Sequence, residues 1–200
     1  MSKWNLLRGR WGSGAGETDE IRIDASTNTI QTIEYEHHEI HSGSSYHAEA
    51  KAAGGSGTKA TITFQTPDTT KYIHAFIHMV SNVEAQYTLG EGSTVTAASG
   101  TTLAALNRNR NILTATVVIS EGTTGGDAAG ALTQGATVTN FGTMLINERQ
   151  IGVGKSGGED RGTSEWVLKR NTVYAMEIES QAATSEVSIR IDYYEHTDRH

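Results

Sequence analysis

Apolar and polar residues alternate near the C-terminal end of the chain. Between 187 and 194, valine, isoleucine and tyrosine at the odd positions alternate with mostly polar residues at the even ones. Residues 172–179 follow the same period, with apolar side chains on one side and Glu177 and Glu179 on the other. A period of two is that of a strand with one buried face. Because the connector 180–185 is polar and too short for a helix, the pattern predicts two antiparallel strands that close an all-β domain.

Further apolar segments follow along the chain, separated by turns rich in glycine, serine and asparagine. The most apolar of them, 71–81, is predicted to be a central strand covered on both faces, since β-branched and aromatic residues dominate it. One helical turn is predicted around 102–106, and surface loops over 122–135 and 152–164. The other predicted strands cover 20–24, 29–40, 46–53, 60–65, 86–89, 112–120 and 140–150.

Short strands with turns at roughly 8–15-residue spacing are typical of β-sandwiches. The fold class predicted is therefore all-β: an antiparallel two-sheet β-sandwich, jelly-roll-like, over 21–200. No internal repeat is visible, which argues against a propeller or a β-helix. The chain of 200 residues is long enough to bury a core of its own.

Residues 1–20 differ from the rest of the sequence. A glycine-rich stretch at 12–16 and an acidic stretch at 17–20 follow a group of apolar residues, which are Trp4, Leu6, Leu7 and Trp11. Apolar anchors before a glycine-rich hinge favour an extended N-terminal arm that becomes ordered on a partner. The alternative is a terminus that packs partly on its own domain, and the sequence leaves both open.

Composition and charge narrow the class of protein. There is no cysteine, which excludes a disulfide scaffold and a cysteine nucleophile, and the formal net charge is −7. An acidic chain is a poor partner for nucleic acid, which requires clustered lysine and arginine. No run of 18 apolar residues is present, so no membrane span is predicted. The apolar stretch at the start is too short for a secretory signal.

Histidines are the densest candidate for chemistry, and they are His37, His38, His41, His47, His74 and His78. If 29–40 and 71–81 were neighbouring strands, three imidazoles would converge on a metal ion or on a symmetry axis. The alternative, which we favour, is a polar face or hydrogen bonding between subunits. Gly154-Lys155-Ser156 lacks the earlier glycine of a phosphate-binding loop, because position 149 is arginine. The residues therefore predict no enzyme and no cofactor.

Asparagine and arginine alternate from Asn107 to Asn111. Arg108 and Arg110 are suited to donate two parallel hydrogen bonds to carboxylates of an acidic neighbouring subunit. The alternative is a solvated turn. Because Leu103 and Leu106 lie beside this segment, an interface is the interpretation that we prefer.

Four blocks resemble a family of structural proteins of tailed-bacteriophage virions, the capsid decoration (cement) proteins. They are 34–43 (EYEHHEIHSG), 106–111 (LNRNRN), 165–174 (EWVLKRNTVY) and 192–197 (DYYEHT), and the resemblance covers about 29–197. It implies a β-sandwich, made in the host cytoplasm, that assembles as a homotrimer on the outer capsid surface. The partners implied are the major capsid protein and further copies of the chain. The arm lies outside the four blocks.

The function predicted from these observations is capsid decoration, in which the protein stabilises the shell by bridging capsomers. The predicted partner-binding residues are Trp4, Leu6, Leu7, Arg8, Arg10, Trp11, Arg108 and Arg110. One alternative is a tail or fibre adhesin for host-surface glycan, with Trp166, Tyr193 or Tyr194 as stacking platforms. Another is a standalone carbohydrate-binding module. Packing of these aromatic rings inside the sheets is the simpler interpretation.

Overall fold

The computed structural model describes residues 8–9, 19–20, 35–68, 70–111, 132–150 and 165–196. The chain divides into two compact units, Met1–His38 and Glu39–His200. In the first unit, β1 (Arg8–Gly9) pairs antiparallel with β2 (Asp19–Glu20), and Arg8 lies opposite Glu20. The one helix in the described residues, α1 (Tyr35–Ser42), spans the boundary between the units. The predicted arm over 1–20 stays a prediction.

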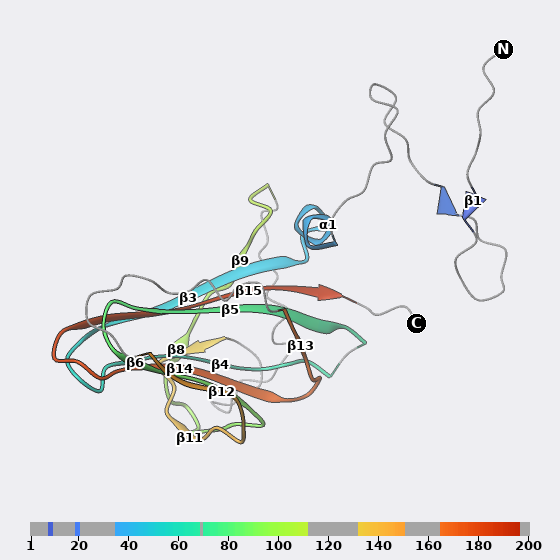
Figure 1. The fold of residues 1–200 in the computed structure, drawn as a ribbon. Coiled ribbons are helices and arrows are strands. Elements are labelled where there is room, and N and C mark those ends of the chain that lie inside the picture. The colour runs from blue at the N-terminus through green and yellow to red at the C-terminus, as the bar shows by residue number, and fades with distance from the viewer. Residues whose placement is uncertain are drawn as a thin grey trace, which may run out of the picture. The chain divides into compact units, whose positions relative to one another are not determined.

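The second unit contains two large antiparallel sheets packed face to face (Figure 1), so the predicted β-sandwich is confirmed. The five-stranded sheet consists, in spatial order, of β13 (Trp166–Leu168), β5 (Tyr72–Ser81), β15 (Ser185–His196), β3 (Ser45–Gly54) and β9 (Leu106–Asn107). The six-stranded sheet consists of β12 (Thr143–Gln150), β6 (Ala85–Glu91), β14 (Val173–Ser180), β4 (Lys59–Gln65), β10 (Thr133–Gln134) and β8 (Thr101–Thr102). A separate pair joins β7 (Thr94–Val95) to β11 (Val138–Asn140).

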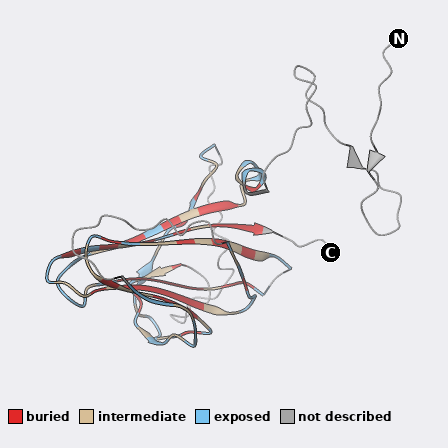
Figure 2. Cartoon of the chain, viewed as in Figure 1, coloured by how far each residue is buried: buried red, intermediate tan, exposed pale blue. Residues whose placement is uncertain are grey.

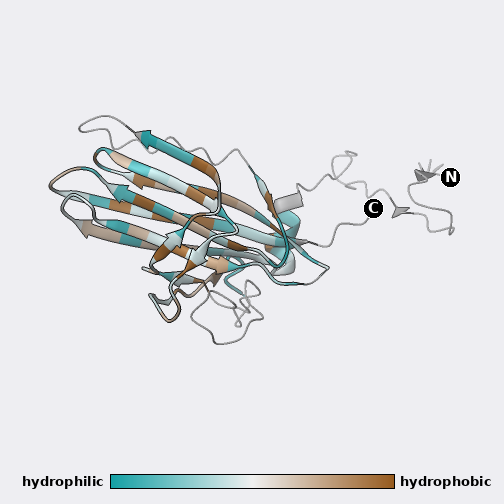
Figure 3. Ribbon diagram, turned by 90° about the horizontal axis from the view of Figure 1, so that it is seen from below, coloured by the Kyte–Doolittle hydropathy of each residue, from teal (hydrophilic) through white to brown (hydrophobic). Residues whose placement is uncertain are grey.

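The core lies between the facing sides of the two sheets (Figure 2). Buried residues alternate with more exposed ones along most of β5, whereas β4 and β14 are buried at five consecutive positions. Figure 3 shows the same alternation as hydrophobic and hydrophilic bands along the strands. Two aromatic pairs lie in the core: Tyr46 stacks on Tyr193 with 5.2 Å between ring centroids, and Phe64 stacks on Tyr174 at 5.9 Å. Burial of the apolar side chains between the sheets is the main force that holds the two sheets together.

The last two strands are present, but they do not pair with each other as predicted. β14 lies between β4 and β6 in one sheet, while β15 lies between β3 and β5 in the other. The connector 181–184 therefore crosses from sheet to sheet. The physical reason is burial, since Glu177 and Ile178 on β14 are only 8% and 0% exposed. Backbone N–H and C=O groups of a strand buried in this way need hydrogen-bond partners on both sides, so the strand takes an interior place in its sheet.

The strand predicted over 29–40 is wrong in its described part, because residues 35–42 form α1. Only Ile40 in this run is aliphatic, so no period of two could bury a strand face here. The helix ends at Ser42 and is followed by Gly43, whose φ of 83° lies in the left-handed region that favours glycine. Gly43 N donates to Ile40 O at 3.2 Å and Ser44 N donates to Glu39 O at 3.0 Å, which together form a Schellman cap.

Three smaller predictions are also corrected. Residues 102–106 form no helical turn, because β8 ends at Thr102 and β9 begins at Leu106. The predicted loop 122–135 contains β10, and Leu132 beside it is 0% exposed because it packs into the core. β5 is central, but only one of its faces is fully buried, since Val80 is 41% exposed.

The strands predicted at 46–53, 60–65, 86–89 and 140–150 are confirmed as β3, β4, β6 and β12. Irregular periodicity at 140–150 corresponds to a register shift between Met144 and Ile146. The predicted strand 112–120 and loop 152–164 lie outside the described residues, as does most of 20–24. No helix among the described residues is long and apolar enough to cross a membrane.

Candidate functional site

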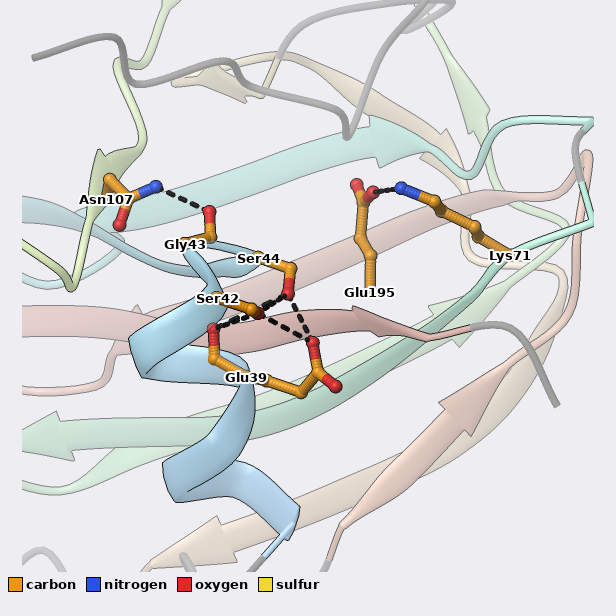
Figure 4. A network of polar contacts seen from close by, with 7 residues as sticks. All are labelled: Glu39, Ser42, Gly43, Ser44, Lys71, Asn107 and Glu195. Carbon is orange, nitrogen blue, oxygen red and sulfur yellow. Dashed lines mark hydrogen bonds and ion pairs between the residues drawn. The ribbon is translucent and has the colours of Figure 1, made fainter. Parts of the chain in front are cut away.

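One end of the five-stranded sheet carries a connected set of polar side chains, drawn in Figure 4. We call it the sheet-end network, and its residues are Glu39, Ser42, Gly43, Ser44, Lys71, Asn107 and Glu195. The network joins the C-terminal end of α1, the start of β3, the end of β15 and the turn after β9.

The carboxylate of Glu39 folds back over the end of its own helix. It accepts hydrogen bonds from Ser44 Oγ and from Ser42 Oγ, the second at 3.2 Å. The two hydroxyls lie 2.6 Å apart, and Ser42 Oγ also donates to the Glu39 carbonyl at 2.9 Å. Glu39 is only 7% exposed. These bonds satisfy a buried charge and hold the last turn of α1 against the first residues of the sandwich.

The turn after β9 holds the same helix end from the opposite side. Asn107 Nδ2 donates to Gly43 O at 2.7 Å, and Asn109 Nδ2 donates to His41 O at 3.2 Å. The backbone adds Arg108 N to Ser45 O at 2.9 Å. Asn109 therefore occupies a carbonyl that the helix end leaves without a partner inside the helix, and Asn107 occupies the carbonyl of the glycine just after it.

β15 completes the network with a buried acid. Glu195 N donates to Ser44 O at 3.1 Å, and the Glu195 carboxylate lies 3.8 Å from Lys71 Nζ with its side chain 1% exposed. The negative charge of Glu195 also acts on the buried aromatic pair beneath it. Burial raises the pKa of Tyr46 and of Tyr193, and the charge of Glu195 raises both further. Both phenols therefore stay neutral under ordinary conditions.

A second polar cluster lies on the outer side of the same sheet, where Glu165 precedes β13. Tyr194 Oη donates to Glu165 Oε1, and His74 Nδ1 lies 2.6 Å from the same oxygen. The His74 ring stacks on Tyr194 with 4.7 Å between centroids. One carboxylate oxygen therefore joins residues of β5, β15 and the β13 approach.

The four blocks of the resemblance are distant in sequence but meet in this region. Block 34–43 contributes Glu39, block 106–111 contributes Asn107, block 165–174 contributes Glu165, and block 192–197 contributes both Tyr194 and Glu195. Their contacts are hydrogen bonds and ion pairs that connect elements of the sandwich. These contacts fix the position of the backbone segments that they connect, and the side chains that make them are occupied by one another.

Convergence of three imidazoles, the interpretation that we did not favour, required 29–40 to be a strand beside 71–81, and the described residues of this run do not meet that condition. His37 and His41 lie on α1 instead of on a strand, so they share no sheet face with His74 and His78. His47 Nδ1 instead lies 2.7 Å from Asp192, and His78 Nε2 lies 3.8 Å from the same carboxylate. Within the described residues, no group of three histidine or carboxylate side chains is arranged to hold a metal ion.

The aromatic residues considered as glycan platforms are packed into the sheets. Tyr193 is 1% exposed and Tyr194 is 4% exposed. Trp166 is partly buried and packs against the core cluster. Neither tyrosine offers a ring face on which a sugar could stack.

An open depression of about 380 Å³ lies between β3 and β4, lined in part by Lys51, Lys59 and Gln134. Both lysines are paired with acids: Lys51 Nζ lies 3.2 Å from Glu49, and Lys59 Nζ lies 2.8 Å from Glu177. The positive charges at this depression are therefore already neutralised by the protein itself.

Most of the predicted partner-binding residues lie outside the described part of the chain. Trp4, Leu6, Leu7, Arg10 and Trp11 belong to this group, and Arg8 is described only as a backbone position in β1. Arg108 and Arg110 follow β9, and Arg110 is exposed. Glu39, Glu165 and Glu195 did not appear among the predicted site residues, and their presence in the four blocks was the only signal that could have found them.

Comparisons with protein-family models, with curated proteins and with solved structures each return no match for this chain.

Proposed function

We propose that this chain is a structural protein of a tailed-bacteriophage virion that decorates the outside of the capsid. In this proposal it is made in the host cytoplasm, acts without catalysis or a cofactor, and assembles with its own copies as a homotrimer. It binds the major capsid protein and stabilises the shell by bridging capsomers. The proposed contacts are the arm residues Trp4, Leu6, Leu7, Arg8, Arg10 and Trp11, together with Arg108 and Arg110.

The observation that carries the proposal is the meeting of the four resembling blocks at one end of the sheet. Scattered chance matches have no reason to share hydrogen bonds, whereas Asn107 bonds to Gly43, and Glu165 bonds to Tyr194. Segments that contact one another in the fold are expected to be kept together in proteins of the same architecture. This supports the resemblance as one of architecture, and the resemblance supplies the capsid role.

The physical character of the site agrees with an assembly role. Its acids are committed to neighbours, as Glu39 is to Ser44 and Glu195 is to Lys71. A protein that bridges capsomers needs a rigid body and a segment that reaches its neighbour, and ordering such a segment is offset by the surface that it buries. The sandwich supplies the body, and residues 1–20 are proposed to supply the reach.

The test is binding to expanded phage heads that lack the protein. Full-length chain should co-sediment with the heads in saturable amounts, and a variant without residues 1–16 should keep the folded sandwich but lose binding. Circular dichroism and thermal unfolding of the truncated variant provide the control for folding. Equal binding of the truncated chain would refute the arm as the contact, and failure of the full-length chain to bind would refute the decoration role.

A further inference from the structure

The turn from Leu106 to Asn111 divides its side chains into two sets with different tasks. Asn107 uses both ends of its amide: Nδ2 donates to Gly43 O at 2.7 Å, and Oδ1 accepts from Asn109 N at 2.8 Å. Asn109 repeats the arrangement, donating to His41 O at 3.2 Å and accepting from Asn111 N at 3.2 Å. The asparagines hold the turn rigidly to the body.

The other residues of this turn are at least partly exposed. Leu106 is 49% exposed at the edge of the sheet, whereas Asn107 next to it is 3% exposed. Arg110 is exposed, and its guanidinium makes one long contact, Nη1 to Asn107 O at 3.4 Å. Arg108 lies between them, with its Nη1 3.4 Å from Ser45 Oγ. We call Leu106, Arg108 and Arg110 the arginine-turn surface.

Arg110 differs from other cations of the sandwich in its partners. Lys59, Lys169 and Arg149 each lie within 3 Å of a glutamate oxygen. Arg110 has no carboxylate within 4 Å in the part of the chain that the structure describes. A guanidinium that no carboxylate of the described residues neutralises retains most of its donors for an external acceptor.

We propose that the arginine-turn surface is a docking site for carboxylate side chains on a partner protein. Arg110 donates two parallel hydrogen bonds to one carboxylate, and Leu106 provides the apolar contact beside it. Because the asparagines already fix the turn, little conformational freedom is lost on binding. That the partner is the capsid protein rests on the proposed function, but the acidic chemistry rests on the turn alone.

The charge of the whole chain favours a protein carboxylate over a nucleic acid. At a net charge of −7, the molecule repels nucleic acid at long range, and two arginines are too few to overcome that repulsion. A few carboxylates on a protein surface interact mainly at short range, where attraction by the nearby guanidinium exceeds the screened repulsion of the whole chain.

The experiment uses full-length, ¹⁵N-labelled chain titrated with a hexaglutamate peptide at low salt. The Nε–Hε signal of Arg110 and the amide signals of 107–111 should shift together, and added salt should weaken the binding. Arg110→Glu should lower the affinity about tenfold, as expected for loss of a charge-assisted contact. Lys51→Glu is the matched control, because it changes the charge equally on a side chain that is 69% exposed.

Equal weakening by Lys51→Glu, or shifts spread over lysines elsewhere, would overturn the proposal, since binding would then follow net charge only. Thermal unfolding should be the same for Arg110→Glu and the native chain, and Arg110→Gln provides a second variant without charge reversal. Peptide binding at the turn without co-sedimentation on heads would refute decoration but keep this surface. Co-sedimentation that is unaffected by Arg110→Glu, with no peptide shifts, would refute the surface but keep decoration.

Discussion

The middle of the sandwich and its sheet-end network are both buried, but different forces hold them. In the middle, Ile62, Ile178 and Ile189 are each 0% exposed, and their side chains carry no polar group that would need a hydrogen-bond partner. At the end, Glu39, Asn107 and Glu195 are 7%, 3% and 4% exposed, and each is committed to a named hydrogen-bond or ion-pair partner. Apolar burial is non-directional, whereas hydrogen bonds are directional.

The two regions therefore have different roles: the middle stabilises the fold, and the network positions the segments at the end of the sheet. The middle provides most of the free energy of folding and tolerates similar apolar side chains of equal volume. The network contributes less energy but determines where α1 and the turn after β9 lie, because its bonds form in one geometry only. Substitutions in the two regions should therefore differ in how much they lower the free energy of unfolding and in how far along the structure their effects extend.

The largest effect is expected from Ile178→Ala in the middle of β14. Removing a fully buried aliphatic side chain should lower the free energy of unfolding by about 3 kcal/mol. Urea unfolding would measure the loss. Val167→Ala, at a side chain that is 55% exposed on β13, is the control and should change stability by less than about 0.5 kcal/mol. Similar losses for both variants would contradict the assignment of the core.

Asn107→Ala should have the next largest effect, about 2 kcal/mol, because it removes the donor to Gly43 O and the acceptor for Asn109 N. Hydrogen exchange should also quicken at the amides of Arg108 and Asn109 while the middle of β14 stays protected. Asn111→Ala, at an exposed position, serves as the control. Uniform loss of protection across both sheets would show that the network is not a local device.

Gly43→Ala should cost about 1 kcal/mol, since alanine is strained at a φ of 83°. The loss should be confined to the cap of α1, and it should appear as reduced helical signal with the sheets intact. Gly55→Ala is a suitable control, because no contact closer than 3.4 Å awaits its Cβ. An unchanged helix in Gly43→Ala would contradict the Schellman cap.

The smallest effect is expected at Glu91, outside the network. Hydrogen bonds from Lys169 at 2.6 Å and from Tyr174 at 2.8 Å lower the pKa of Glu91 below its usual value. A lowered pKa in the folded state stabilises the protein above the unfolded-state pKa, and this stabilisation is lost as the pH falls through the folded-state value. Glu91→Gln should therefore cost about 1 kcal/mol at pH 7, and this cost should vanish at acid pH below the lowered folded-state pKa of Glu91.

Chemical denaturation across that pH range would measure the difference between Glu91→Gln and the native chain. Glu186→Gln, which replaces an exposed carboxylate, is the control variant. A constant difference at every pH would mean that the ionised carboxylate is not the stabilising species.

The alternation of residues predicted most of the sandwich, because a strand with one buried face records its period in its own sequence. It did not predict that β14 and β15 belong to different sheets, since the partners of a strand are distant in sequence and leave no local trace. The helix at 35–42 was missed because its single aliphatic residue, Ile40, sets up no helical period. Its capping residues, His41 before Ser42-Gly43, were the signal that could have revealed it.

The site was predictable only in part. Alternating asparagine and arginine drew attention to 107–111 as an interface, which stays a prediction. The tasks of Asn107 and Asn109 depend on carbonyls at the C-terminal end of α1 and just after it, more than sixty residues earlier in the chain. Glu195 looked like one more acid at the end of an alternating strand. Its burial against Lys71 depends on how the sheets close, which no local pattern records.

The central claim is tested most directly by electron microscopy of intact virions that contain this chain. The proposal predicts density on the outer surface of the head into which the two-sheet sandwich fits, with contacts that bridge neighbouring capsomers. Density for the sandwich on the tail or its fibres, or heads that lack it altogether, would contradict the proposal.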